Sequence, residues 1–410
     1  PLISRLRRRD VGAIIAVKIF IYCQHVWGLG HFFRMLEIAR ALEAHDVLLV
    51  TGGPAVDVPL PSNVRRVQLP AVRMLADKQL VADDGRALED VWTTRIAELH
   101  ALFRTENPDA LIIELYPFGR TAFGRELDPL LTSIRSGALP PCRVYCSVRD
   151  ILVAKRDPPA YEARVVRKLN RWFDALLVHA DRSLVELDAT FDNMKAIQIP
   201  VLYTGYVAQP LERQNSRSQR LQLAYGLQAD EQLIVASAGG GRAGYPLLAA
   251  VLGAQTLLAA QRRVRILMFT GPYMPDARRA ALEAAAGQGV VIRRFTADFR
   301  HCLAAADLSL SMAGYNTCMN LIAAGRPALV WPFEGDREQP LRAARLAERG
   351  WVSVLATADL DPSRLAARIE AALRQAPQPG RPIDLQGAAQ TARLVVQYPA
   401  TAPSDRERRR

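Results

Sequence analysis

Cysteine is scarce in this sequence, and its placement argues against a disulfide framework and a zinc site. There are five cysteines, an odd number, and no two pairs have the spacing of zinc ligands. Cys142 and Cys146 are close together on an expected strand, but no second pair accompanies them. Free thiols in apolar runs behave as small hydrophobic residues. We therefore expect reduced thiols, a cytoplasmic location and no metal.

Long hydrophobic runs are also missing. No stretch reaches the roughly 18 uninterrupted apolar residues that a membrane-spanning helix needs. Arginines at 7–9 followed by apolar residues 11–17 are similar to a signal peptide. However, Lys18 interrupts the apolar run and no small-residue cleavage site follows, so we expect a basic tail at 1–16 and no leader.

The basic charge lacks the pattern of a nucleic-acid-binding protein. The net charge is +12, but there is no lysine-rich helix and no basic stripe interleaved with aromatic residues. Much of the arginine lies in the first and last ten residues. We therefore expect no nucleic-acid partner. An anionic membrane or a phosphate-bearing substrate suits such a surface, and solvated arginine-rich tails suit it equally.

What the sequence does have is length, apolar residues and regular alternation. Its 410 residues, half of them hydrophobic, are enough for two domains. Strand and helix patterns alternate, which predicts an α/β fold of two doubly wound, Rossmann-like domains facing a cleft. The strands are expected at 18–23, 46–51, 64–68, 110–114, 143–147, 175–179, 233–237, 264–269, 290–293, 306–310, 327–331 and 352–355.

The expected domain boundaries follow from breaks in this alternation. Residues 17–205 form the N-terminal domain, a linker at 206–218 follows, and residues 219–376 form the C-terminal domain. A C-terminal helix is expected within 377–398, and crossing back to the N-terminal domain is one option for it. Residues 399–410 are expected to be a tail.

Three glycine turns in the second half each follow an expected strand: Gly239, Gly240 and Gly241, then Gly271, then Gly314. A strand, a glycine turn and a helix N-terminus together direct backbone N–H groups at an anion. The first turn is not a P-loop, because the Lys-Ser/Thr ending is missing. Three such turns in one domain favour a shared phosphate-bearing ligand over three unrelated tight turns.

Polar and aromatic residues near these turns are candidates for binding the other groups of that ligand. Phe295 is placed to stack on a base, or simply to pack on the sheet. Asn316 and Thr317 are either ligand contacts or helix caps. Asn320 is one turn further along the same helix face. Asp336, Glu338 and Gln339 are able to bind hydroxyl groups, or only begin a helix. Such a pattern suggests a nucleotide-sugar.

The first glycine loop, residues 24–34, is not a dinucleotide fingerprint, because Phe33 occupies the third glycine position. A nicotinamide oxidoreductase is therefore not favoured. His31 begins a helix, where the positive end of the dipole lowers the pKa of an imidazole and favours the neutral, proton-accepting form. His31 is the candidate general base, with a capping or core histidine as the alternative. His25 is more easily read as a loop residue.

From residue 18 to about residue 397, the sequence resembles GT-B glycosyltransferases of family 28, which includes the lipid II-forming N-acetylglucosaminyltransferases. It resembles more closely an uncharacterised bacterial branch of predicted glycosyltransferases. The resemblance assigns Gly28, Gly30 and His31 to the acceptor-side loop. It assigns the following residues to the donor site: Gly239, Gly240, Gly241, Phe295, Thr296, Ser311, Ala313, Gly314, Asn316, Thr317, Asn320, Asp336, Glu338 and Gln339.

Three residues depart from the family pattern. Asn320 occupies a position where the family commonly has a glutamate on the ribose hydroxyls, and an amide bonds them without charge assistance. Gly241 replaces a serine of the lipid II enzyme. The acceptor loop carries Trp27 and Arg34, so the acceptor need not be a lipid-linked muropeptide.

The resemblance implies an inverting, metal-independent glycosyltransferase that uses a nucleoside-diphosphate sugar, with UDP favoured, and no cofactor. Arg242 and Arg149 are candidates for added positive charge, the latter with Arg34 on the acceptor side. The acceptor is unknown, with lipid-linked and polysaccharide acceptors both open, and peripheral contact with the inner membrane face is also open. Two alternatives remain: a UDP-sugar epimerase of the same architecture, and a non-catalytic sugar-nucleotide-binding subunit.

Overall fold

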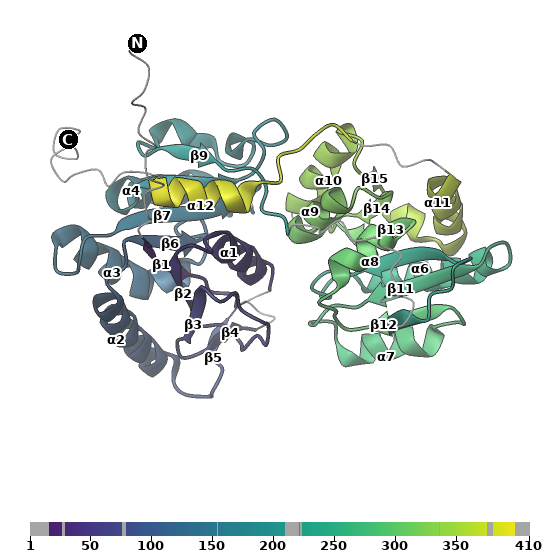
Figure 1. Ribbon diagram of the computed structural model, residues 1–410, viewed down its shortest axis with the longest axis horizontal. Helices are drawn as coiled ribbons and strands as arrows, with labels where there is room; N and C mark the ends of the chain where they lie inside the picture. The colour runs from purple at the N-terminus through teal and green to yellow at the C-terminus, as the bar shows by residue number, and fades with distance from the viewer. Residues whose placement is uncertain are drawn as a thin grey trace, which may run out of the picture.

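The computed structural model describes residues 16–26, 29–75, 79–153, 155–209, 221, 224–335, 337–374 and 380–397. These residues form two α/β domains that stand side by side (Figure 1). Each domain is built on a parallel sheet covered by helices, and the chain passes from one domain to the other after β9. The α/β prediction of two Rossmann-like domains is confirmed.

The N-terminal domain has a seven-stranded sheet in the order β3-β2-β1-β6-β7-β8-β9, and every strand pair in it is parallel. Its strands are β1 (Lys18–Tyr22), β2 (Asp46–Thr51), β3 (Val64–Gln68), β6 (Ala110–Glu114), β7 (Arg143–Arg149), β8 (Ala175–His179) and β9 (Val201–Tyr203). Its helices are α1 (Gly30–Ala41), α2 (Leu88–Glu106), α3 (Gly124–Ser136) and α4 (Pro158–Trp172). A separate antiparallel pair joins β4 (Val72–Met74) to β5 (Leu80–Ala82).

The C-terminal domain has a six-stranded parallel sheet in the order β12-β11-β10-β13-β14-β15. Its strands are β10 (Gln232–Ser237), β11 (Val264–Phe269), β12 (Val290–Arg293), β13 (Leu308–Met312), β14 (Ala328–Trp331) and β15 (Ser353–Val354). Its helices are α6 (Tyr245–Ala259), α7 (Asp276–Ala285), α8 (Phe299–Ala305), α9 (Tyr315–Ala324), α10 (Glu338–Glu348) and α11 (Pro362–Arg374).

Burial on both faces explains why the strands are apolar throughout. In β1, Ile19 and Ile21 pack with α1 residues on one face, whereas Phe20 and Tyr22 pack with α2 and α3 residues on the other. A parallel sheet needs such double cover, because its crossover helices lie on both faces. The carboxyl ends of all strands in a sheet then lie along one edge, where ligands bind in this class of fold.

The last helix, α12 (Gly387–Gln397), belongs in space to the N-terminal domain. Figure 1 shows it lying over that domain after the chain has completed the C-terminal sheet. Val395 is fully buried in the same core as Ile19 and Phe32. The C-terminal end of the chain therefore ties the two domains together.

The structure confirms most expected strands and corrects a few elements. The bounds of β2, β3, β6, β8, β11 and β12 agree with the expected ranges. The strand expected at 306–310 is wrong in its limits: β13 runs from Leu308 to Met312, so Ser311 belongs to the strand and not to the turn. The short elements β4, β5, β9 and α8 were not expected. Tails 1–15 and 398–410 lie outside the described residues, as do positions 210–218 of the expected linker.

All five cysteines are buried free thiols. Within the described residues, no helix combines the length and the hydropathy that crossing a bilayer requires.

Candidate functional site

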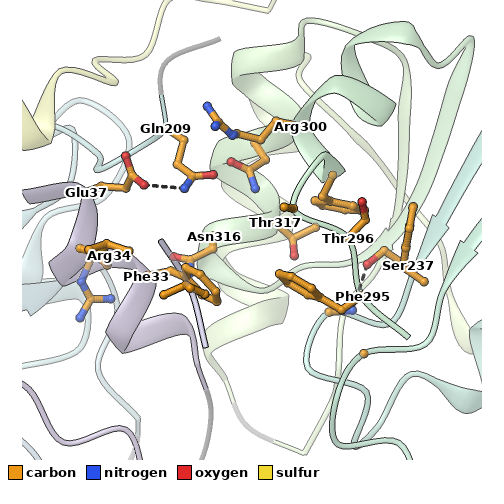
Figure 2. Close-up of a pocket in the computed structure, with 18 of the residues that line it drawn as sticks. Phe33, Arg34, Glu37, Gln209, Ser237, Phe295, Thr296, Arg300, Asn316 and Thr317 are labelled. Atoms are coloured by element: carbon orange, nitrogen blue, oxygen red, sulfur yellow. Dashed lines mark hydrogen bonds between the residues drawn. The ribbon is translucent and has the colours of Figure 1, made fainter. Parts of the chain in front are cut away.

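A cavity of about 450 Å³ lies between the two domains (Figure 2). One wall comes from α1, the loop at 57–60 and the segment leading out of β9; the other wall comes from strand ends of the C-terminal sheet. All of the predicted donor-side residues that line it are uncharged. The predicted donor-side residues that line the cavity are Gly239, Gly271, Phe295, Thr296, Asn316, Thr317 and Asn320.

The glycine turns after β10 and β11 are packed against each other. Gly239, Gly241 and Gly271 all have positive φ, at 58°, 97° and 82°. A Cβ at Gly271 would lie 2.3 Å from the Gly239 carbonyl oxygen, so only glycine allows this approach. These two turns form one surface at the edge of the sheet, and the Gly314 turn is not packed against them.

The amides of these turns are less available than the sequence suggested. The Gly239 N–H donates to Ser237 Oγ at 3.1 Å, and the Gly241 N–H donates to the Ala238 carbonyl at 3.1 Å. Gly240, Gly241 and Arg242 are not among the cavity-lining residues. The Arg242 guanidinium lies 5.2 Å from the Tyr273 ring centroid instead. The expectation of several bare amides in this loop is therefore corrected.

The N-terminus of α9 is the stronger anion site. Gly314 caps this helix and has no side chain, so the cap residue offers the first-turn amides no side-chain acceptor. A Cβ at Gly314 would meet nothing within 4 Å, which shows that the cap faces open space. Asn316 and Thr317, in the same turn, line the cavity. An anion in the cavity would therefore be stabilised by amides and by the helix dipole.

Two predicted donor residues lie below this surface. Ser311 is fully buried in β13, and its Oγ has no hydrogen-bond partner in the described part of the chain. Ala313 is also fully buried, and its carbonyl accepts a hydrogen bond from Arg342 Nη1 at 3.0 Å. Neither lines the cavity, because β13 continues further than the sequence indicated.

An aromatic pair crosses the cavity. Phe295, after β12, is 53% exposed, and its ring is stacked on Phe33 of α1 with centroids 6.3 Å apart. Figure 2 shows these two side chains approaching each other from the two domains. Thr296 Oγ1 beside them accepts from the Tyr225 hydroxyl and the Asp298 N–H, both at 3.1 Å. The exposed ring fits contact with a ligand better than core packing.

His31 forms a pair with a carboxylate that the sequence analysis missed. His31 is the second residue of α1, and its Nδ1 lies 2.5 Å from Oε1 of Glu114, the last residue of β6. Arg34 Nη2 donates to the same oxygen at 2.6 Å. Glu114 is fully buried, while the His31 side chain is 17% exposed. His31 is beside the cavity and not in its wall: the Gly30 carbonyl accepts from Asn316 Nδ2 at 3.0 Å, and Asn316 lines the cavity.

The surroundings keep this histidine neutral. The pKa of His31 is lowered to about 4: burial has the largest effect, Glu114 opposes it, and the charges of Arg120 and Arg34 add to the lowering. The pKa of Glu114 is held at about 2 by His31, Arg34 and Arg120, against the effect of burial. An ionised Glu114 accepts a hydrogen bond from Nδ1–H, which leaves the Nε2 lone pair as the proton acceptor. A base oriented in this way is what proton abstraction from a hydroxyl requires.

We predict that His31 remains neutral from pH 8 down to about pH 5, because burial has lowered its pKa. Glu114→Gln should lower that pKa further, since the carboxylate charge favours the imidazolium. NMR titration of the imidazole resonances, with His31→Gln to assign them, measures both values. A His31 that titrates near 6.5, or a pKa that rises in Glu114→Gln, would contradict this electrostatic picture.

A buried cluster of charges joins the domains behind the cavity. Arg342 of α10 donates to both oxygens of Asp150 at 2.7 and 2.8 Å, and both side chains are fully buried. Glu338 accepts from Arg342 Nη2 at 3.0 Å and pairs with Arg149 Nη2 at 2.7 Å. These contacts link the end of β7 in the N-terminal domain to α10 in the C-terminal domain.

Two predicted assignments are corrected by this cluster. Glu338 was expected to bind donor hydroxyls and Arg149 to face the acceptor, but they pair with each other. Gln339 Oε1 accepts from the Phe333 N–H at 3.1 Å, and Asp336 lies outside the described residues.

The remaining acceptor-side residues divide into two kinds. His25 is 2% exposed, and its Nε2 lies 2.8 Å from the Pro54 carbonyl, so it is a structural residue. Arg34 is 3% exposed, but it lines the cavity and contacts Glu114. Gly28 lies outside the described residues, as does Trp27. Gly30 is the contact point between α1 and α9.

Some cavity residues gave little signal in the sequence. Gln209 Nε2 donates to Glu37 Oε1 at 2.5 Å, closing one side of the cavity (Figure 2). Glu114 did have a signal, because a carboxylate that ends a fully buried apolar strand lies at the ligand-binding edge. Within the described residues, no three His, Cys, Asp or Glu side chains are grouped to hold a metal ion.

The C-terminal domain is similar in sequence to a known protein family. Residues 235–396 match the glycosyltransferase family 28 C-terminal domain. A UDP-N-acetylglucosamine--N-acetylmuramyl-(pentapeptide) pyrophosphoryl-undecaprenol N-acetylglucosamine transferase from Mesorhizobium japonicum is 36% identical over 123 residues, which is 29% of this chain and 33% of that protein. The matched segment thus spans about a third of that relative's length.

Solved structures share the fold over nearly the whole chain. MurG of Acinetobacter baumannii has a TM-score of 0.51 and 16% identity, covering 93% of this chain and 97% of that one. The calicheamicin glycosyltransferase CalG4 has a TM-score of 0.57 and 16% identity, covering 93% and 94%. The architecture is therefore GT-B, and the chain resembles glycosyltransferase family 28.

Proposed function

We propose that this protein is an inverting, metal-independent glycosyltransferase that moves a sugar from a UDP-sugar to an acceptor hydroxyl. The observation that carries the proposal is the contact of two helix N-termini beside the interdomain cavity. Neither α1 nor α9 has a side-chain cap, and Asn316 of α9 bonds Gly30 of α1. Two positive dipole ends in one place favour an anion between them, and a diphosphate supplies it.

In this proposal the C-terminal wall holds the donor. The diphosphate lies at the N-terminus of α9, near Gly314 and Thr317, and the base lies by Phe295 and Thr296. Amide donors would stabilise the departing UDP in the way a metal ion does elsewhere. The similarity of residues 235–396 to a family 28 domain supports a nucleotide-sugar as the ligand.

His31 would act as the base. Its Nε2 would take the proton of the acceptor hydroxyl as the oxygen attacks the anomeric carbon from the side opposite to UDP, which inverts the configuration. Glu114 would fix the ring and stabilise the imidazolium that forms. UDP would depart as the leaving group, the imidazolium would then release its proton to solvent, and no metal or cofactor is part of the scheme.

A thermal-shift screen against UDP-, dTDP- and GDP-sugars tests the donor assignment. A ligand at about 100 times its Kd stabilises the folded state by about 2.7 kcal/mol, so a UDP-sugar should raise the melting temperature clearly and the other nucleotides less. A screen in which no nucleotide-sugar shifts the transition would contradict the proposal.

An epimerase of the same architecture remains the second candidate. Its donor pocket would be the same, but it would release UDP without any acceptor. The oriented His31–Glu114 pair at the N-terminal side of the cavity favours transfer over epimerisation. Mass spectrometry of the products separates them, because only a transferase forms a product in which the sugar is joined to the acceptor. A non-catalytic subunit would turn over only with a complementing protein.

We also propose that the protein is cytoplasmic and makes peripheral contact with an anionic membrane, where a lipid-linked acceptor would be found. Arg164, Arg167 and Arg171 are exposed on α4. Each basic residue near an anionic surface contributes about 1 kcal/mol. Replacing all three with glutamine should therefore reduce sedimentation with anionic vesicles at low salt at least about tenfold.

Arg278, Arg345 and Arg364 are exposed on C-terminal helices, and their triple glutamine variant is the matched control. Equal losses of sedimentation in both variants would assign the effect to net charge and would rule out α4 as the contact surface. If the wild-type protein does not sediment with the vesicles, the proposed membrane contact is wrong.

A further inference from the structure

Tyr315 is a residue of the donor-side helix whose side chain lies in the other domain. It is the first residue of α9, next to Gly314 and Asn316, yet it is only 5% exposed. Its hydroxyl donates to the His179 carbonyl of β8 at 3.0 Å and accepts from the Val207 N–H at 3.1 Å. The residue that begins the proposed diphosphate site is thus anchored in the N-terminal domain.

The Tyr315 ring lies within cation–π distance of two arginines. The guanidinium carbon of Arg34 is 5.4 Å from the ring centroid, and that of Arg342 is 5.5 Å from it. Both distances are within the range of cation–π attraction, which strengthens when the groups are buried. Arg34 is 3% exposed and Arg342 is fully buried.

Arg34 contacts both the Tyr315 ring and the His31–Glu114 pair. Its Nη2 donates to Glu114 Oε1 at 2.6 Å, and the same oxygen lies 2.5 Å from His31 Nδ1. Because both contacts use one carboxylate oxygen, a displacement of Arg34 changes the position of Glu114 relative to the imidazole. Asn316 adds a second link, since it bonds the carbonyl of Gly30, the residue before His31.

We infer that Tyr315 and Arg34 are positioning residues that couple the donor-side helix α9 to the His31–Glu114 pair. The inference rests on the proposed function for the identity of the ligand at α9 and on the contacts above for the coupling. Through this path, the base is correctly arranged only while α9 holds Tyr315 against Arg34. The C-terminal domain therefore sets the geometry of a base that belongs to the N-terminal domain.

The imidazole of His31 reports this coupling directly and requires no acceptor. The charged groups that act on it are Glu114 of β6, Arg34 of α1 and Arg120 of the loop after β6, together with burial. Arg34 lowers the pKa of His31, so a loosened Arg34 should raise it. NMR titration of His31 in the full chain measures the shift.

Three variants define the expected result. Tyr315→Met fills the space without a π system and should raise the pKa of His31 by at least about half a unit. Tyr315→Phe keeps a ring beside both guanidiniums and should leave this pKa unchanged. Arg34→Met should raise it at least as much as Tyr315→Met. If the methionine variant at 315 does not fold, Tyr315→Leu repeats the test with a second aliphatic side chain.

The double variant decides whether Tyr315 acts through Arg34. In Arg34→Met/Tyr315→Met the pKa of His31 should equal that of Arg34→Met alone, because the loss of Arg34 already removes the contact between Tyr315 and Glu114. An unchanged pKa in folded Tyr315→Met, an equal rise in Tyr315→Phe, or additive rises in the double variant would each overturn the inference.

Calorimetry of the wild-type protein with UDP is run in parallel. Lack of UDP binding would contradict the proposed function and leave the His31 titrations to test the coupling.

Discussion

His31→Ala is expected to lower sugar transfer by about 10²- to 10⁴-fold and to leave UDP binding within about threefold. Positioned general-base catalysis contributes rate factors of this size. His31 is paired with Glu114 and lies outside the wall of the cavity, so the nucleotide keeps its own contacts. Turnover of the UDP-sugar identified by the thermal-shift screen and calorimetric titration with UDP measure the two quantities.

His25→Ala is the matched control. His25 is another histidine of the same loop, but it is buried and contacts the Pro54 carbonyl, so its loss should reduce stability and leave the turnover per folded molecule nearly unchanged. If His31→Ala retains turnover within about tenfold of the wild-type value, His31 is not the base.

Arg342→Met is expected to destabilise the protein by about 3–5 kcal/mol, the cost of breaking a buried ion pair from one side. Arg342 satisfies both oxygens of Asp150 and one of Glu338, and none of these side chains is appreciably exposed. Without the guanidinium, buried Asp150 loses its arginine partner, while Glu338 keeps its pairing with Arg149. Urea unfolding monitored by tryptophan fluorescence measures the change in the free energy of unfolding.

The double variant Arg342→Met/Asp150→Asn tests the physical reason. Removing the second charge should recover part of the lost stability, because an unpaired buried carboxylate is the main cost. Arg345→Met is a control on the same helix, since Arg345 is exposed and pairs only with Glu348 at the surface. An Arg342→Met protein within about 1 kcal/mol of the wild type would show that the cluster does not hold the domains together.

The fold could be predicted largely from the sequence because its signals are local. Buried parallel strands such as β2 and β6 contain continuous apolar runs, and glycines soon after the strand mark the ends of β2 and β11. The elements that escaped prediction are short or polar. The strand β9 has three residues and follows Pro200, while α8 has seven residues and follows a strand end rich in arginine.

The site was only partly predictable, because it depends on which strands are neighbours. Glu114 is 83 residues from His31, and they meet because β6 lies beside β1 in the sheet. Arg149 and Glu338 were assigned to opposite sides of the cavity, and no local pattern indicates that they pair across the domains. The uncapped N-terminus of α9 was the opposite case: glycine, small residues and a helix pattern identified it directly.

The central claim is that main-chain donors at α9 bind a diphosphate without a metal ion. Calorimetric titration with UDP and with uridine, each in EDTA and in excess Mg²⁺, tests it most directly. We predict that UDP binds at least about 100-fold more tightly than uridine, a difference of about 2.7 kcal/mol, and equally well in EDTA and in Mg²⁺. Equal affinity for UDP and uridine, or UDP binding that requires Mg²⁺, would contradict the account.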